Sequence, residues 1–108
     1  MADLGKDNVK LLMQWDIKQE SEQEFFEFQV REWIPGITQM GLEPTGAWYT
    51  AYSHGDTPQI MTEGLAEDLA TMRRILDSEE WKTLHGKLLE FVNNYQQKVV
   101  RVTGGFQL

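Results

Sequence analysis

The sequence contains no cysteine, which excludes disulfide bonds, a thiolate nucleophile and any metal site built on cysteine. It is also poor in positive charge, because 10 lysines and arginines against 17 aspartates and glutamates give a net charge of -7. Nucleic acids and anionic membranes are bound by basic surfaces, so neither is an expected partner. No apolar run approaches the roughly 18 residues of a membrane span, and the first ten residues, MADLGKDNVK, lack the apolar core of a signal peptide. We therefore expect a cytoplasmic protein.

The 108 residues match the size of one domain, and 41% of them are hydrophobic while 11% are aromatic. This content is sufficient for a packed core, so intrinsic disorder is not expected. The sequence has no internal repeat and no low-complexity linker. We interpret residues 1–108 as a single domain.

The first predicted strand is the segment VKLLMQWDI, residues 9–17, in which every second residue is apolar. A period of two is typical of a strand with one buried face. Further strands are predicted at residues 45–53, 59–66 and 96–103, and the last of them is rich in β-branched residues. Residues 54–58, HGDTP, are typical of a turn that joins the second and third strands into a hairpin.

The first helical region begins with a capping box formed by Ser21 and Glu24, in which each side chain can accept a hydrogen bond from the other's backbone N–H. A broad apolar stripe follows the capping box. Pro35 is expected to kink this helix, and Gly41 is expected to end it.

The second helical region opens near Glu67 and carries apolar residues at helical spacing. It pauses where Asp77 and Glu80 form another capping signature, and it ends at Asn93 and Asn94. The predicted order of elements is therefore βαββαβ. With right-handed crossovers this order predicts an α+β, ferredoxin-like fold, an antiparallel sheet with both helices on one face.

The predicted helices leave the opposite face of the sheet uncovered. Both faces of the second strand carry large aromatic side chains, Trp48 on one and Tyr49 on the other, so one of them lies on the uncovered face. Exposed apolar surface costs about 25 cal/mol per Å². We therefore expect a homodimer in which two open sheet faces pack together across a two-fold axis.

The segment DSEEWKTL, residues 77–84, is followed by Leu88, Phe91 and a valine-rich strand. This pattern resembles the end of NIPSNAP-like domains, and the element order resembles the dimeric α+β barrel superfamily. The resemblance implies a homodimer with a cavity between the sheet and the helices of each protomer. Relatives include cofactor-independent antibiotic-biosynthesis monooxygenases, haem-degrading oxygenases, haem-dependent chlorite dismutases and small isomerases, and fold alone does not choose among them.

Three residues are candidates for acid–base catalysis. His54, at the end of the second strand, and His85, on the last helix, are candidate general bases or haem ligands. Glu63, on the third strand, is a candidate buried carboxylate of raised pKa. The structural alternatives are a solvated turn histidine, a histidine at the boundary of a helix surface, and a strand carboxylate that faces water.

The sequence has many large aromatic residues that are candidates for binding a flat apolar ligand such as a quinone or a polyketide: Trp15, Trp33, Trp48, Trp81, Tyr49 and Tyr52. Of these, Trp15, Trp48, Tyr52 and Trp81 are the preferred candidates. The alternative is that these residues form the core and the dimer interface. No metal site and no cofactor is expected, because His54 and Asp56 supply only two ligands. Haem-degrading relatives combine asparagine, tryptophan and histidine, and the first strand offers no matching asparagine.

Two functions remain open from the sequence. The protein is either a binder or cofactor-independent oxygenase of a flat apolar molecule, or a non-catalytic dimeric structural or interaction domain. The first function is favoured if two aromatic residues, a histidine and a carboxylate converge on one cavity. A cavity filled by the protein's own side chains favours the second.

Overall fold

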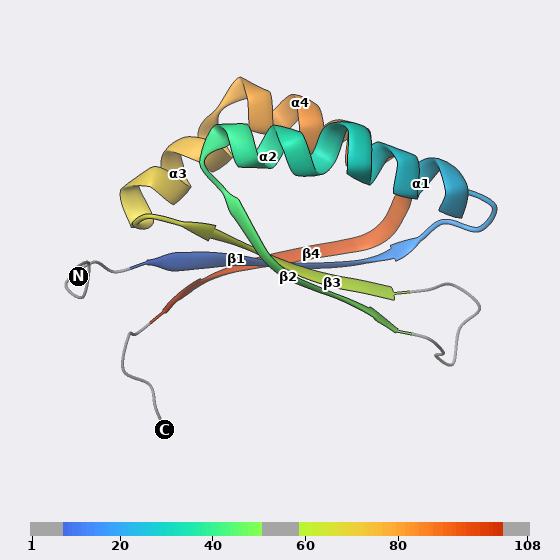
Figure 1. Ribbon diagram of the computed structural model, residues 1–108, viewed down its shortest axis with the longest axis horizontal. Coiled ribbons are helices and arrows are strands. Elements are labelled where there is room, and N and C mark those ends of the chain that lie inside the picture. Colours follow the sequence, from blue (N-terminus) through green and yellow to red (C-terminus); the bar gives the residue numbers. More distant parts are fainter. Residues whose placement is uncertain (1–7, 51–58, 103–108) are drawn as a thin grey trace.

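The computed structural model describes residues 8–50 and 59–102 and contains a four-stranded antiparallel sheet (Figure 1). The strands are β1 (Val9–Ile17), β2 (Glu43–Thr50), β3 (Gln59–Ala66) and β4 (Val92–Arg101), in the spatial order β2-β3-β1-β4. This order places β1 and β3 in the middle of the sheet and leaves β2 and β4 as its edges. The ferredoxin-like arrangement predicted from the sequence is confirmed.

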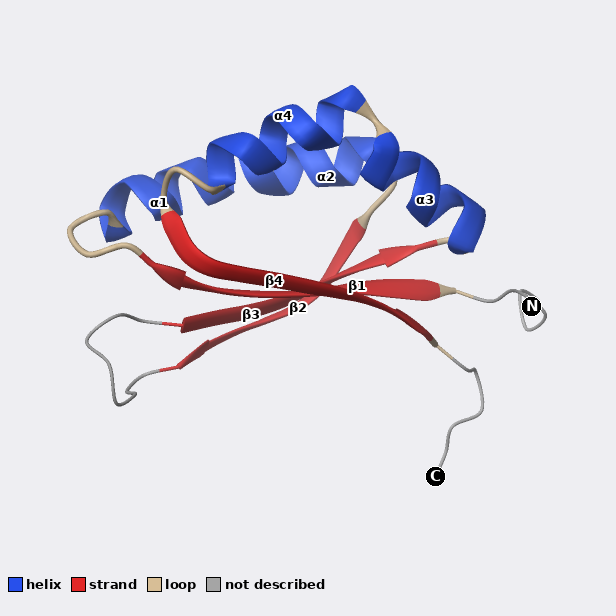
Figure 2. Ribbon diagram, turned by 180° about the vertical axis from the view of Figure 1, so that it is seen from behind, coloured by secondary structure: helices blue, strands red, loops and turns tan. Residues whose placement is uncertain are grey.

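The helical elements all lie on one face of the sheet, as Figures 1 and 2 show from opposite sides. They are α1 (Glu22–Phe28), the π-helix η2 (Gln29–Trp33), α2 (Ile34–Met40), α3 (Leu69–Asp77) and α4 (Glu79–Leu88). The predicted placement of the helices on a single face is therefore correct. Within residues 8–50 and 59–102, no helix has the length and apolarity required to cross a membrane.

Strand β1 follows the alternation of its sequence. Its odd-numbered residues are buried beneath the helices, namely Val9, Leu11, Met13, Trp15 and Ile17. Its even-numbered residues are half-buried and lie on the face that the helices leave uncovered. The core of the protein therefore lies between the sheet and the helices.

The first helical region is continuous through Pro35, which lies in the first turn of α2. The preceding segment, η2, is a π-helix in which the Ile34 N–H donates to the carbonyl of Gln29, five residues earlier. Proline has no N–H and its ring would clash with the carbonyl four residues earlier, so the wider turn accommodates it. The predicted end at Gly41 is confirmed by its left-handed conformation (φ 105°). The predicted capping box is wrong, because the Ser21 side chain makes no capping hydrogen bond.

The second helical region consists of two helices with separate caps. Asp68 caps α3 by accepting from the Thr71 N–H at 2.8 Å. Ser78 caps α4 by accepting from the Trp81 N–H at 3.1 Å, so the predicted cap at Asp77 is wrong by one residue.

Candidate functional site

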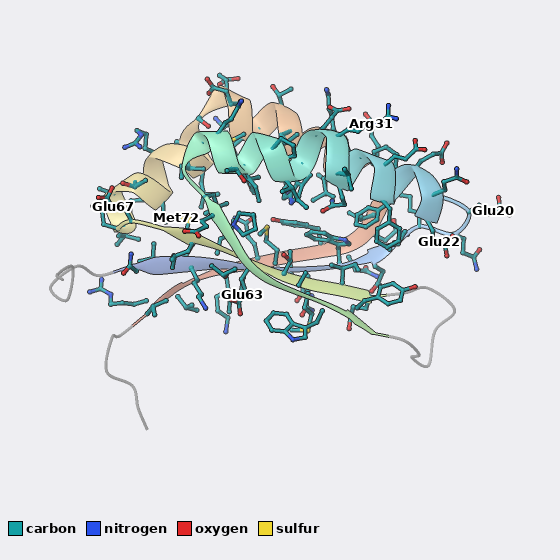
Figure 3. The ribbon with its side chains drawn as sticks, in the orientation of Figure 1. Glu20, Glu22, Arg31, Glu63, Glu67 and Met72 are labelled. Atoms are coloured by element: carbon teal, nitrogen blue, oxygen red, sulfur yellow. The ribbon has the colours of Figure 1, made fainter. Side chains whose placement is uncertain are left out.

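An aromatic cluster fills part of the space between the sheet and the helices. Its five members are Trp15 of β1, Trp33 of η2, Trp81 and His85 of α4, and Tyr95 of β4. Neighbouring ring centroids lie 6.2 Å apart for Trp15–Trp33, 5.6 Å for Trp33–Trp81, 5.3 Å for Trp81–His85, 4.5 Å for His85–Tyr95 and 5.8 Å for Tyr95–Trp15. These contacts form a closed circuit of rings, and Figure 3 shows side chains filling the interior beneath the helices.

Helix α4 positions two members of the aromatic cluster. Trp81 and His85 are four residues apart, so they lie on the same face of the helix and stack with an interplanar angle of 13°. The capping bond from Ser78 fixes the backbone at Trp81. The ion pair between Lys87 and Glu32, at 2.8 Å, links α4 to η2, which carries Trp33.

A β-bulge positions Tyr95. One residue of β1 lies between Gln14 and Asp16, whereas two residues of β4 lie between their partners Gln96 and Asn93. The extra residue is accommodated at Asn94, whose φ is 58°. As a result, the Tyr95 ring faces the helices and stacks on Trp15 with an interplanar angle of 11°.

The aromatic cluster contains two buried polar atoms that have no hydrogen-bond partner among the described residues, His85 Nε2 and Trp15 Nε1. Outside the cluster, Nε2 of Gln29 in η2 is also buried without a partner there. Leaving such an atom unpaired costs about 1–3 kcal/mol, and native proteins contain few of them. Burial lowers the pKa of His85, so its imidazole is neutral at neutral pH. Burial raises the pKa of Tyr95, whose hydroxyl donates to Gln97 Oε1 at 2.8 Å.

The structure brings together four of the residues singled out from the sequence, namely Trp15, Trp33, Trp81 and His85. Trp48 lies on the opposite face of the sheet, where 56% of its surface is exposed. Two further candidates, Tyr52 and His54, fall outside the described residues.

Glu63 also lies on the open face of the sheet, paired with Leu12 of β1. It accepts hydrogen bonds from Lys10 Nζ and Thr45 Oγ1, each at 2.9 Å. The hydrogen bond from Lys10 lowers the pKa of Glu63. The expectation of a raised pKa at Glu63 is therefore wrong, because the residue is paired with a cation instead of standing alone in an apolar site.

Trp48 lines a groove of about 590 Å³ on the open sheet face. Leu12, Trp48 and Met61 give the groove its apolar character, and Lys98 and Glu63 lie along it. Met61 is 46% exposed. The aromatic residues predicted to form one ligand site are therefore divided between the two faces of the sheet.

Metal binding has no structural support in residues 8–50 and 59–102, which contain no group of three or more histidine, aspartate or glutamate side chains able to hold an ion. Tyr95 is absent from the sequence-based candidates, although it belongs to the aromatic cluster. Pro35 is the only local signal for the π-helix that ends at Trp33, and the Asn93–Asn94 pair is the only local signal for the bulge at Tyr95.

No protein-family model and no curated protein match the sequence. Solved structures do match the fold. A NIPSNAP domain protein from Burkholderia xenovorans aligns with a TM-score of 0.64 at 14% identity over 85% of this chain and 91% of its own. A second NIPSNAP-like domain protein from that organism aligns with a TM-score of 0.64 at 20% identity, and the alignment covers 94% of this chain and 90% of its own. The chain has a NIPSNAP-like fold.

The same NIPSNAP-like fold occurs in SnoaB, a cofactor-independent oxygenase from Streptomyces nogalater. It aligns with a TM-score of 0.64 at 13% identity over 87% of this chain and 91% of its own. Identities this low establish a common fold and leave the activity open. The resemblance noted in the sequence is thus confirmed at the level of the fold.

Proposed function

We propose that the protein binds a flat apolar molecule in the aromatic cluster, in contact with His85. The observation that supports this proposal is the buried, unpartnered Nε2 of His85, held between Trp81 and Tyr95. His85 and Tyr95 are only half-buried, so the cluster can be reached from the surface on the side of α4 and β4. Because rings already occupy the cluster, binding requires one of these two side chains to rotate.

The two unpartnered atoms determine which ligand chemistry fits. The Trp15 indole can only donate a hydrogen bond, so it suits a carbonyl oxygen. The neutral His85 imidazole can accept a hydrogen bond from a hydroxyl group or take its proton. The proposed ligand is therefore a flat compound that carries oxygen substituents. Metal-free oxidation of such a compound is the activity suggested by the likeness to SnoaB, with His85 as the base.

Indole N–H signals in NMR spectra test the proposed binding. The four tryptophans give four such signals, and we expect 1,4-naphthoquinone and 1-naphthol to shift those of Trp15 and Trp81 but not that of Trp48. His85→Phe keeps a flat ring but removes the nitrogen atoms, so the dissociation constant for 1-naphthol should rise about tenfold. Trp48→Leu is the matched control on the opposite face and should bind as the wild type does.

Two results of this titration would contradict the proposal. One is the absence of any shift at Trp15 and Trp81 with either probe. The other is binding that His85→Phe retains and Trp48→Leu removes, which would place the ligand in the open-face groove. The oxygenase activity is tested separately by oxygen uptake with 1,4-dihydroxynaphthalene, which His85→Phe should reduce to the spontaneous rate.

The second candidate function is that of a non-catalytic dimeric domain. It is favoured by the filled interior and by the absence of a carboxylate from the aromatic cluster. The exposed side chains of Trp48 and Met61 support a homodimer formed through the open sheet face, because a second copy would cover them. A single-chain mass of 12.6 kDa in light scattering would contradict this assembly.

The cytoplasmic location stays a prediction from the sequence, for which cell fractionation is the test.

A further inference from the structure

A second apolar surface lies beside the edge strand β2, away from the open sheet face. We define the β2-edge surface as Phe26, Val30, Ile34 and Tyr49, all of which are exposed. The first three recur at every fourth residue along the α1–η2–α2 rod, and Val30 is 71% exposed. Tyr49 joins them because its ring centroid lies 6.3 Å from that of Phe26. Figure 1 shows this rod on the β2 side of the molecule.

The backbone of β2 is also available for pairing, since β3 is its only neighbour in the described sheet. From residue 44 to its end at Thr50, the strand has the sequence PTGAWYT and contains no charged residue. The opposite edge, β4, carries Lys98, Arg101 and the bulge at Asn94, which are features that prevent edge-to-edge pairing. The register irregularity of β2 lies between Pro44 and Gly46, so the segment beyond it is regular. Strand β2 is therefore less protected than β4 against pairing with a strand of another chain.

We propose that a second copy of this chain docks on the β2-edge surface, with its own β2 antiparallel to the first. Two identical edge strands can pair in this way about a two-fold axis perpendicular to the sheet. The same axis places the two helical rods antiparallel on one side of the joined sheets. Phe26, Val30 and Ile34 of each copy then face those of the other, with Tyr49 beneath them.

The charges beside this stripe are self-complementary. Glu27 and Arg31 border it, together with Phe26 and Val30, and neither forms an ion pair within the described residues. The antiparallel arrangement brings Glu27 of one copy toward Arg31 of the other. A chain with a net charge of -7 repels its copies over most of its surface, whereas this border has one charge of each sign. The charge pattern therefore favours a second copy over a strongly basic or acidic partner.

The test uses the Met61→Glu background, in which the open sheet face cannot close on another copy. We expect sedimentation equilibrium of Met61→Glu to give twice the chain mass of 12.6 kDa, and Val30→Glu added to it to give a single chain. Thr83→Glu, at an exposed position of α4 outside the β2-edge surface, is the matched control and should leave the mass doubled. Glu27→Arg and Arg31→Glu should each weaken this association about tenfold, and the two together should restore it.

A single-chain mass for Met61→Glu at millimolar protein would overturn the proposal, as would a doubled mass that Val30→Glu leaves intact. The result is independent of the open-face dimer. If wild type and Met61→Glu have the same doubled mass and Val30→Glu alone is a monomer, the edge contact stands and the open-face contact fails. Circular dichroism of each variant verifies that the fold is retained.

Discussion

At the scale of single residues, His85 is the group whose surroundings differ most from what its sequence position indicates. A histidine one residue from the apolar face of a helix is expected at a boundary with water. In the structure it stacks on Trp81 and meets Tyr95, and its Nε2 is buried without a partner. The local sequence places Trp81 beside His85, because the two residues are four positions apart on one helix. Tyr95, in contrast, comes from another element, β4. Its contact with His85 depends on the bulge in β4.

The stability of the protein should therefore depend on pH through His85. Burial lowers the pKa of His85 in the folded state below the ordinary value of 6.5, so the unfolded chain binds the proton more readily. The free energy of unfolding should fall as the pH drops below about 6.5, and His85 should contribute nothing to this dependence above that value. Urea unfolding at about pH 7.5 and about pH 5.5 measures this change.

His85→Phe is the control for this pH dependence, because it retains His54 and every carboxylate. Its free energy of unfolding should fall less between the two pH values than that of the wild type. Equal losses in the two proteins would show that His85 does not titrate below its ordinary pKa in the folded state. NMR titration of the His85 ring then gives the pKa directly.

At the scale of elements, sequence patterns located some helix ends and missed others. The end predicted at Asn93 and Asn94 is wrong, because α4 ends at Leu88 and both asparagines belong to β4. The motif of a capping residue followed by glutamate fits both Ser21–Glu24 and Asp77–Glu80, yet neither pair forms the bond. The actual cap of α4 is Ser78, whose Oγ accepts from the Trp81 N–H and donates to the Ile75 carbonyl at 2.7 Å. The choice between neighbouring caps depends on where α3 ends, and packing determines that end.

Ser78→Ala should lower the free energy of unfolding by about 1 kcal/mol, because it leaves the Trp81 N–H without its capping acceptor. Asp77→Ala should change it by less than about 0.5 kcal/mol, since Asp77 is the last residue of α3 and caps nothing. Chemical denaturation of the two variants beside the wild type compares them. A larger loss for Asp77→Ala than for Ser78→Ala would assign the cap to Asp77 after all.

At the scale of the whole molecule, one face of the sheet is covered and the other is not (Figures 1 and 2). The open face combines an apolar groove at Trp48 and Met61 with the ion pair of Lys10 and Glu63. Such a face has apolar area to bury and polar groups that restrict how a second copy can align. The proposed open-face dimer follows from this combination.

Met61→Glu should weaken the open-face dimer, because it adds a negative charge to the interface from each copy of an acidic protein. We expect the mass measured by light scattering to fall by half relative to wild type at the same concentration. Val99→Glu is a suitable control, because Val99 is also an exposed strand residue but lies on the helix side of the sheet. A wild-type mass of one chain, or an unchanged mass for Met61→Glu, would contradict a dimer formed through this face.

The sequence by itself determined the backbone elements and their order. The alternation in residues 9–17 defined which side chains of β1 are buried. The third strand has its predicted bounds at Gln59 and Ala66. The order βαββαβ leads to the sheet order β2-β3-β1-β4. These features depend on interactions between near neighbours along the chain and on the handedness of crossovers. They are therefore readable without tertiary contacts.

Only the tertiary structure decided which side chains share a site. Trp15 and Tyr95 meet because β1 pairs with β4, and Glu63 is held by Lys10 because β1 also pairs with β3. The same registers place Trp48 on the face opposite Trp15. Strand register and bulges are determined by packing between distant segments, and a shift of one residue moves a side chain to the other face. The chemistry of the aromatic cluster and the pKa of Glu63 follow from that packing.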